Sequence, residues 1–575
     1  MSLVFLSMLL RGVYFVELNR GPFIALHHWD QTDMHYFDGW GRAIAGGDWL
    51  SSSVGVPMHA WHDAVAGRYF SDHPDSRTEL EREAAAAQPP TTADRLLWSR
   101  WTGGHQFYQD PLHAYLIGLT YALFGADPRY VFVWQMMLGV LTNVLIYQLT
   151  RRLFGELAGA VAGVLAVLCG PLMFYELFLL RDSTIAVSGL GIVWLTMKAI
   201  DTGRTRWFVV LGLALGLATL LKSTFALLAL IVATGIIVSG RRASRPLLLP
   251  LGAMACGLAI AFGALAARNA VVGAPPLALA GSGALTFVAS NDVAYSALDG
   301  FNYDEGWIAD ILGRTDGRLL PSLVETIRPH TVATMATVLW NKFGATWHWY
   351  EIPNNVNFYY IRLHAPVIAW LPMTFFVLSP LSLVGLFLGL QRRRAAWPLY
   401  SLVVCHVLAL TLFLVLGRLR VALVAALIPF AALTIVRLVR AQGRVRLATL
   451  AAVIGLGVWT GRPLPDDRPL IGVDDWMSPF VIEYQSQVKQ ALDAGNRDGA
   501  VAAYLAFLRY EPDFSKMPSA GGVFTGASDR EVAYRFAQAH AVCAELLRGS
   551  GRAADAATEE ARARTLIAEA GSAER

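Results

Sequence analysis

Five basic side chains of this sequence stand at the ends of separate apolar runs, where charge is costly: Arg181, Lys222, Arg268, Arg418 and Arg420. A charge at bilayer depth costs at least about 2.5 kcal/mol on insertion scales, so such residues are usually paired or functional. Guanidinium and ammonium groups bind phosphate well, and several can converge on one anion. The set therefore predicts a site for a lipid phosphate. The alternative for each residue is that its side chain snorkels to lipid headgroups.

Acidic side chains complement these cations. A carboxylate close to a bound phosphate can act as a general base toward a hydroxyl or amine. For Asp33 the alternative is a helix cap, because it precedes a helical pattern. Asp38 is more readily explained as solvated, and Glu176 and Asp182 could simply neutralise Arg181. The candidate carboxylates are Asp33, Asp38, Asp110, Glu176 and Asp182.

An aromatic and polar run at 347–355, WHWYEIPNN, is the third chemical signal. Aromatic rings stack on the apolar faces of sugars, and amide groups bind sugar hydroxyls. Trp347 and Trp349 are equally explained by the aromatic belt at a membrane interface. Such a belt needs no Glu351 and no amide pair, so Glu351, Asn354 and Asn355 are predicted to bind a sugar or an acceptor.

Membrane helices must position these residues. Of the 575 residues, 55% are hydrophobic and only 16% are charged, which is too little charge to cover a soluble protein of this size. The net charge of +4 does not indicate nucleic-acid binding, because the basic residues punctuate apolar runs. The four cysteines have no metal-binding spacing, and no cofactor is indicated. A span needs roughly 20 residues, and eleven are predicted, near 3–18, 130–149, 157–177, 184–197, 207–220, 224–239, 247–267, 366–390, 398–416, 421–436 and 447–460. The first carries Arg11, so either this helix is tilted with a snorkelling arginine or the true start lies upstream.

The basic connectors between these spans predict the orientation. Cytoplasmic loops are rich in Lys and Arg, and the basic connectors alternate correctly with eleven spans. Three large segments then face outward, at about 19–129, 269–365 and 461 to the C-terminus, and the chemistry lies on that side. The cytoplasmic set is Arg151, Arg152, Lys198, Arg204, Arg206, Arg241, Arg242, Arg245, Arg392, Arg393, Arg394, Arg437, Arg440, Arg444 and Arg446.

The outer segments have structure of their own. Amphipathic stretches at 36–45 and 111–124 predict helices in the interface plane, whereas 79–90 is expected to be mobile. We therefore expect a membrane domain over 1–461 and a helical tail over 462–575. The tail resembles one degenerate tetratricopeptide-type helix pair around 500–512. A single pair cannot bury its own face, so it should dock on the membrane domain or bind a protein partner.

An ordered set of motifs between residue 30 and about residue 430 resembles a known family. The set resembles the C-type fold of membrane glycosyltransferases, in particular the bacterial relatives of family 39. That family includes protein O-mannosyltransferases and the aminoarabinose transferases of lipid A. The motifs are Asp33 with Tyr36 and Phe37, the runs 108–115 and 121–125, LRDS at 180–183, LKS at 221–223, RN at 268–269, 349–355, and GRLR at 417–420.

The resemblance implies an inverting transferase in a bacterial inner membrane, which moves a sugar from a polyprenyl-phosphate donor to a periplasmic lipid, glycan or protein. Asp33 would deprotonate the acceptor, and the basic residues at the helix ends would hold the leaving phosphate. Asp110 and His113 depart from the residues common in relatives, so with Asp182 they are candidates for acceptor or sugar binding. No metal ligand is implied.

Two other readings remain open. A transporter or flippase of lipid-linked sugars would show paired broken helices in two halves, and no internal repeat is visible. A catalytically inactive scaffold would use its tail for interaction, and the presence of Asp33 beside the outer cations argues weakly against it.

Overall fold

The structure is a computed structural model that describes residues 2–88, 90–242, 244, 246–298, 300, 303–465, 469–514 and 528–572. Within these ranges the chain is helical and contains no β-strand, apart from one isolated bridge between Cys169 and Met373. The predicted all-α fold is confirmed.

Six apolar stretches of the described residues are long enough to cross a membrane. One of them, Phe375–Leu412, consists of two helices that fold back on each other. Tyr400 Oη donates to the carbonyl oxygen of Leu386 at 2.6 Å, whereas residues this far apart in one straight helix would be separated by roughly 20 Å. The stretches are α7 (Pro128–Phe154), α10 (Asp182–Thr202), α12 (Phe225–Arg242), α13 (Leu248–Val272), α20 (Phe375–Gly389) with α21 (Arg393–Leu412), and Arg418–Arg440, which contains α22 (Val421–Arg440).

Every predicted span overlaps a helix, and two spans are interrupted. The span at 157–177 continues as the short α9 (Gly170–Phe174) and η2 (Tyr175–Leu177), because Pro171 cannot continue the hydrogen-bond ladder. The span at 366–390 breaks at Pro372, between α19 (Pro366–Trp370) and α20. The shorter helices are α1 (Ser2–Leu18), α8 (Glu156–Val167), α11 (Thr205–Leu221) and α23 (Gly443–Thr460).

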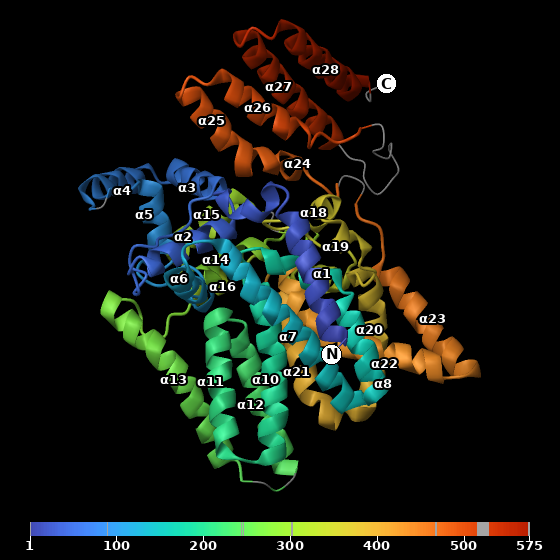
Figure 1. Ribbon diagram of the computed structural model, residues 1–575. Coiled ribbons are helices and arrows are strands. Elements are labelled where there is room, and N and C mark those ends of the chain that lie inside the picture. Colours follow the sequence, from blue (N-terminus) through green and yellow to red (C-terminus); the bar gives the residue numbers. More distant parts are fainter. Residues whose placement is uncertain are drawn as a thin grey trace. The chain divides into compact units, whose positions relative to one another are not determined.

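Arginine-rich connectors lie together at one end of the helices. Arg152 pairs with Asp201, which joins the ends of α7 and α10. Arg392 Nη1 donates to the carbonyl oxygen of Leu153 at 2.8 Å, which brings the α20–α21 connector to the same end. Figure 1 shows the α12–α13 connector at one end and α3 to α5 at the other. These contacts fit the predicted alternation of loops; Arg245 lies outside the described residues.

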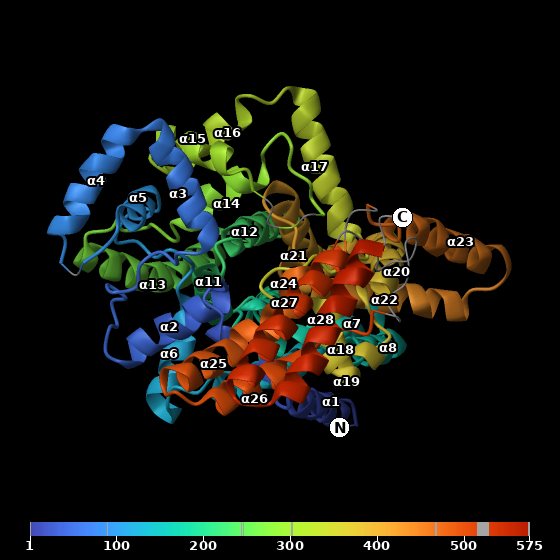
Figure 2. The same cartoon turned by 90° about the horizontal axis from the view of Figure 1, so that it is seen from above.

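The two large segments near 36–129 and 269–354, which were predicted to face outward, are largely helical (Figure 2). Both predicted amphipathic stretches are helices, α2 (Asp33–Ala45) and α6 (Leu112–Phe124). The expected mobility of 79–90 is wrong for its first part, because α4 (Pro74–Ala86) is a helix. A buried core with Phe70, Trp98 and Val288 joins the two segments. It is formed by α3 (Ala60–Asp72), α5 (Ala93–Trp101), α14 (Ser282–Ser290) and α15 (Glu305–Thr315). α16 (Leu319–Ile327) and α17 (Val332–Trp347) complete the second segment.

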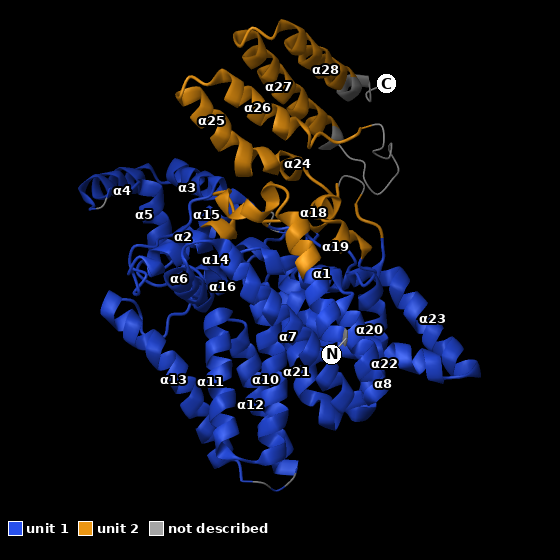
Figure 3. Cartoon of the chain, in the orientation of Figure 1, with its two compact units in different colours: residues 1–11, 36–354, 371–462 blue, residues 12–35, 355–370, 463–575 orange. Residues whose placement is uncertain are grey.

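Two compact units make up the chain (Figure 3). Unit 1 comprises residues 1–11, 36–354 and 371–462, and unit 2 comprises 12–35, 355–370 and 463–575. The division after residue 462 is close to the predicted boundary, but two short segments group with the tail. They do so because Phe23 of η1 (Pro22–His28) packs on Tyr360 and His364 of α18 (Phe358–His364) and on Tyr510.

The tail contains two helix pairs rather than one. α25 (Gln485–Asp493) and α26 (Arg497–Leu508) form the first pair, and α27 (Ser528–Gly549) and α28 (Ala553–Ser572) form the second. α24 (Val473–Pro479) and η5 (Phe480–Tyr484) precede them. Glu511 accepts from His540 at 2.6 Å and from Arg562, which ties the connection after α26 to both helices of the second pair.

Candidate active site

Three of the five predicted cations share one electrostatic neighbourhood in unit 1. Arg181 precedes α10, Lys222 follows α11, and Arg418 begins η4 (Arg418–Arg420). The charges of Arg181 and Arg418 both act on Lys222, as do those of Asp110 and Asp182. Burial, with the nearby Arg181, lowers the pKa of Lys222 to about 8. Three cations and two carboxylates thus lie in this neighbourhood. We call Arg181, Lys222 and Arg418 the cation group.

Asp110 and His113 lie beside this group. Arg181 Nη1 is 3.3 Å from Asp110 Oδ2. Asp110 Oδ1 is buried and makes no hydrogen bond with the described residues. His113 is buried against the rings of Phe37 and Trp134, and the charge of Arg181 acts on it. Both of its ring nitrogens also lack a partner among the described residues. Buried polar atoms without partners are costly, so this corner is suited to a polar ligand.

An apolar groove begins next to the cation group. Its volume is about 580 Å³, and it is lined by α6, α7, α10 and α11. Three lining residues are close in sequence to charged members of the site: Leu112 follows Asp110, Thr184 follows Asp182, and Leu221 precedes Lys222. Leucine side chains and Trp134 make up much of the remaining wall. The groove therefore places an apolar surface next to residues that flank the charged site in sequence.

Arg420 and Glu351 form a separate buried ion pair. Arg420 is completely buried, and its Nη2 is 2.9 Å from Glu351 Oε2. Its guanidinium also donates to the carbonyl oxygens of His348 and Tyr350 and lies 4.4 Å from the Phe375 ring centroid. Burial raises the pKa of Glu351, and Arg420 opposes this shift. This pair fixes the 348–351 run, which favours a structural role for Arg420 over the predicted phosphate contact.

Arg268 hydrogen-bonds to backbone carbonyl groups and is not part of the cation group. Its guanidinium donates to the carbonyl oxygens of Leu50, His105 and Ser51 at 2.8, 2.9 and 3.3 Å. The Phe107 ring centroid lies 3.8 Å from its central carbon. Arg268 thus fastens the first outer segment to the end of α13, and these contacts favour a positioning role.

Asp33 and Asn355 bind each other within unit 2. Asn355 Nδ2 donates to Asp33 Oδ2 at 2.9 Å, and the backbone N–H of Asp33 donates to Asn355 Oδ1 at 2.9 Å. Asn355 has a φ of 63°, in the left-handed region that asparagine tolerates better than most residues. The capping role considered for Asp33 is taken by its neighbour, because the Thr32 hydroxyl accepts from the N–H of His35 at 3.2 Å.

Two other carboxylates have different partners from those expected. Glu176 does not neutralise Arg181; both of its oxygens accept from Arg11 at 2.7 Å. Arg11 therefore forms a buried ion pair inside the helix bundle and does not snorkel to the lipid headgroups. Asp38 is not solvated, because it accepts from Arg42 and from Tyr121 Oη at 2.6 Å each.

The aromatic run is anchored to the end of α23. Trp347 is buried, which argues against a belt position, and the Trp349 indole N–H donates to the carbonyl oxygen of Arg462 at 2.9 Å. Sequence reasoning missed Tyr175, whose neighbours include Asp182, Glu351, Arg418 and Arg420. Its hydroxyl lies 3.0 Å from where a Cβ would stand on Gly417. A tyrosine inside an apolar run carried no sequence signal, because such residues are common in membrane helices.

Comparison with known proteins bears on this site. Residues 109–266 match the family model described as dolichyl-phosphate-mannose-protein mannosyltransferase. The matched segment contains Asp110, His113, Arg181, Asp182 and Lys222. No curated protein sequence matches the chain significantly.

Solved structures with weak similarity to the chain include an oligosaccharyltransferase and ArnT. One is an oligosaccharyltransferase from Archaeoglobus fulgidus, tethered with an acceptor peptide. It is 14% identical to this chain with a TM-score of 0.33, and the alignment covers 89% of this chain and 60% of the oligosaccharyltransferase. Another is ArnT from Cupriavidus metallidurans, bound to undecaprenyl phosphate. It is 18% identical to this chain with a TM-score of 0.25, and the alignment covers 66% of this chain and 75% of ArnT. The match over residues 109–266 agrees with the resemblance that the sequence motifs indicate.

Proposed function

We propose that the protein is an inverting glycosyltransferase of the bacterial inner membrane, which takes a sugar from a polyprenyl-phosphate donor. The acceptor is a lipid, glycan or protein on the periplasmic side. One observation carries the proposal: residues close in sequence to the cation group and its carboxylates line an apolar groove. A polyprenyl phosphate has the matching form, with one anionic end and a long apolar tail.

The cation group suits the leaving phosphate. As the bond from the anomeric carbon to the phosphate oxygen breaks, negative charge grows on that oxygen. Fixed positive groups aimed at such a charge stabilise the transition state more than the ground state. Arg181 offers a planar guanidinium, and Lys222 a compact ammonium. Asp110 and Asp182 keep the empty site from carrying three uncompensated charges.

Asp33 is the proposed general base. Its carboxylate would take the proton of an acceptor hydroxyl or amine as that atom attacks the anomeric carbon. The sugar bond to the acceptor forms while the bond to the polyprenyl phosphate breaks, so one in-line displacement inverts the configuration. The Asn355 amide donates to Asp33 Oδ2 at 2.9 Å, so Asn355 acts as a positioning residue.

The first test compares transfer with donor binding. Purified Asp33→Asn protein should bind a polyprenyl-phosphate sugar normally, yet transfer it about 10²- to 10⁴-fold more slowly, because an amide cannot accept the proton. Asp30→Asn, three residues earlier, is the matched control and should keep wild-type turnover. Wild-type turnover by Asp33→Asn would remove this base from the mechanism and leave Asp110 as the next candidate.

A transporter or flippase is the competing function. Reconstituted protein that moves a labelled lipid-linked sugar across vesicles, with no transfer to any acceptor fraction, would replace the proposal. Transfer with release of polyprenyl phosphate would support it.

A further inference from the structure

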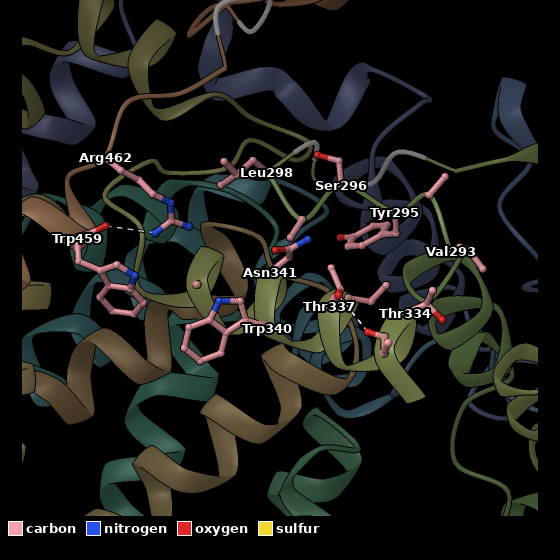
Figure 4. A pocket seen from close by; sticks show the side chains of 15 residues that line it. Val293, Tyr295, Ser296, Leu298, Thr334, Thr337, Trp340, Asn341, Trp459 and Arg462 are labelled. Atoms are coloured by element: carbon pink, nitrogen blue, oxygen red, sulfur yellow. Dashed lines mark hydrogen bonds between the residues drawn. The ribbon is translucent and has the colours of Figure 1, made fainter. Parts of the chain in front are cut away.

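A second pocket, of about 720 Å³, shares no lining residue with the groove. It lies in unit 1 between the loop 293–298, one face of α17 and the end of α23 (Figure 4). Two indole rings and a guanidinium stand at one end, and a phenol ring with two threonines stands at the other. These residues are Trp340, Trp459 and Arg462, then Tyr295, Thr334 and Thr337.

Arg462 places a guanidinium group at one end of this pocket. Within the ranges that the structure describes, no carboxylate pairs with it. Its Nη1 donates to the carbonyl oxygen of Trp459 at 3.2 Å, and its guanidinium lies 5.9 Å from the Trp459 ring centroid. Gly344 makes room for it, since a Cβ at that position would lie 3.0 Å from Nη2. A half-buried guanidinium with one carbonyl contact retains donors for an anion.

Lys342 adds a second positive charge behind the opposite wall. It is fully buried, its Nζ donates to Asn291 Oδ1 at 2.7 Å, and it lies 5.1 Å from the centroid of the Tyr295 ring, which lines the pocket. Burial lowers the pKa of Lys342 to about 7. A buried ammonium without a nearby carboxylate is costly, and an anion in the pocket would offset part of that cost.

The position of Arg462 is fixed independently of its side chain. Its carbonyl oxygen accepts from the indole N–H of Trp349 at 2.9 Å and lies 2.9 Å from His348 Nε2. The backbone at the mouth of the pocket is therefore tied to the aromatic run. A substitution of the Arg462 side chain leaves these bonds intact.

Apolar surface leads up to the pocket from two sides. α23 exposes Leu447, Ile454 and Val458 along its length and carries Trp459 in its last turn. α17 exposes Val332 and Trp340, of which Trp340 is 64% exposed. Indole rings favour the headgroup level of a bilayer. The pocket therefore combines a phosphate-binding group, hydroxyls and an amide with flanking surfaces suited to acyl chains.

We propose that this pocket binds the phosphate-bearing headgroup of an anionic membrane lipid, in the leaflet that meets the C-terminal end of α23. The Arg462 guanidinium binds the phosphate, and Asn341, Thr334 and Thr337 bind headgroup hydroxyls. The acyl chains lie along α23. This lipid is separate from the sugar donor, whose phosphate is assigned to the cation group.

Native mass spectrometry of the purified full chain tests this site. We expect the wild type to retain phosphatidylglycerol in preference to phosphatidylcholine, and Arg462→Gln to lose that preference by about tenfold, as expected for one charge-assisted contact. Arg440→Gln, at an exposed arginine at the end of α22, is the matched control and should bind like wild type. Arg462→Lys should restore part of the preference, and an unchanged melting temperature would show that Arg462→Gln folds.

Three outcomes would overturn the proposal. Unchanged phosphatidylglycerol retention by Arg462→Gln would remove Arg462 from any lipid site. Equal retention of phosphatidylcholine by the wild type would leave only apolar contact. Displacement of the lipid by glycerol 3-phosphate at similar concentration would assign the pocket to a soluble phosphate compound instead.

Discussion

Charged side chains near the membrane take two forms in this protein. Arg420 is completely buried, and its guanidinium forms an ion pair with Glu351 and donates to two backbone carbonyl oxygens. Arg181, Lys222 and Arg418 are each half-buried and together face two carboxylates. Arg11 follows the first form, in a bidentate pair with Glu176. In the sequence, both kinds of cation look the same, because each lies in or at the end of an apolar run. Only the hydrogen-bond and ion-pair partners in the structure distinguish a cation that stabilises the fold from one that can bind a ligand.

The largest loss of stability should come from breaking the buried ion pair between Arg420 and Glu351. Arg420→Met leaves Glu351 buried without its partner, which should destabilise the protein by about 3–5 kcal/mol. Thermal melting in detergent would detect this. The double variant Arg420→Met with Glu351→Leu should recover most of the loss, because no buried charge is then left. If the double variant melts at as low a temperature as Arg420→Met, then Arg420 stabilises the protein through contacts other than its pair with Glu351.

The opposite pattern is expected in the cation group. Arg418→Gln should lower kcat/KM for a polyprenyl-phosphate sugar by about 10- to 100-fold, the value of a hydrogen bond to a charged group. Its melting temperature should stay close to that of wild type. Arg437→Gln, at an exposed arginine at the other end of α22, is the matched control and should change neither quantity. Strong destabilisation with normal activity per folded molecule would move Arg418 into the structural class.

The sequence was sufficient to find the cations at the helix ends, but not to tell which of them stabilise the fold and which could bind a ligand. Arg181, Lys222 and Arg418 stand out because charge is rare beside apolar runs. Arg268 stands out for the same reason, yet its partners are the carbonyl oxygens of Leu50, Ser51 and His105, and no pattern in the sequence reveals contacts more than 150 residues away. The sign of a charge and its position are local, whereas its neutralisation depends on tertiary contacts.

The helices themselves were largely predictable, because apolar length and basic connectors are local signals. The interruptions at Pro171 and Pro372 were readable in principle from proline chemistry. The helices within 51–104 were missed, since their polar surface hides a small core around Trp98. The second helix pair of the tail was also missed, because α27 and α28 are rich in alanine and charge and resemble solvated sequence.

A smaller effect should appear with pH. Lysine is cationic below its pKa and neutral above it, and the pKa of Lys222 is lowered to about 8. Donor affinity should therefore be highest below pH 8 and fall by about tenfold between pH 7 and pH 9. Lys222→Arg stays charged over this range and should bind with little pH dependence. The same decline in both proteins would show that another group titrates.

The smallest effect is expected at Asn355. Asn355→Gly removes the amide that orients Asp33 while tolerating the positive φ. Loss of one such hydrogen bond should slow turnover by about fivefold without weakening donor binding. The acid limb of the pH–rate profile should also shift upward, because the carboxylate loses a donor that favours its charged form. An unchanged profile would make Asn355 merely structural.

A structure of the protein with polyprenyl phosphate bound tests the central claim most directly. We predict that the phosphate contacts Arg181, Lys222 and Arg418, with the first isoprene units in the groove between α6, α7, α10 and α11. Arg420 and Arg268 should keep their present partners. Polyprenyl phosphate bound through Arg462 in place of the cation group, or through Arg420 after its pair with Glu351 opens, would contradict the assignment of the donor phosphate to Arg181, Lys222 and Arg418.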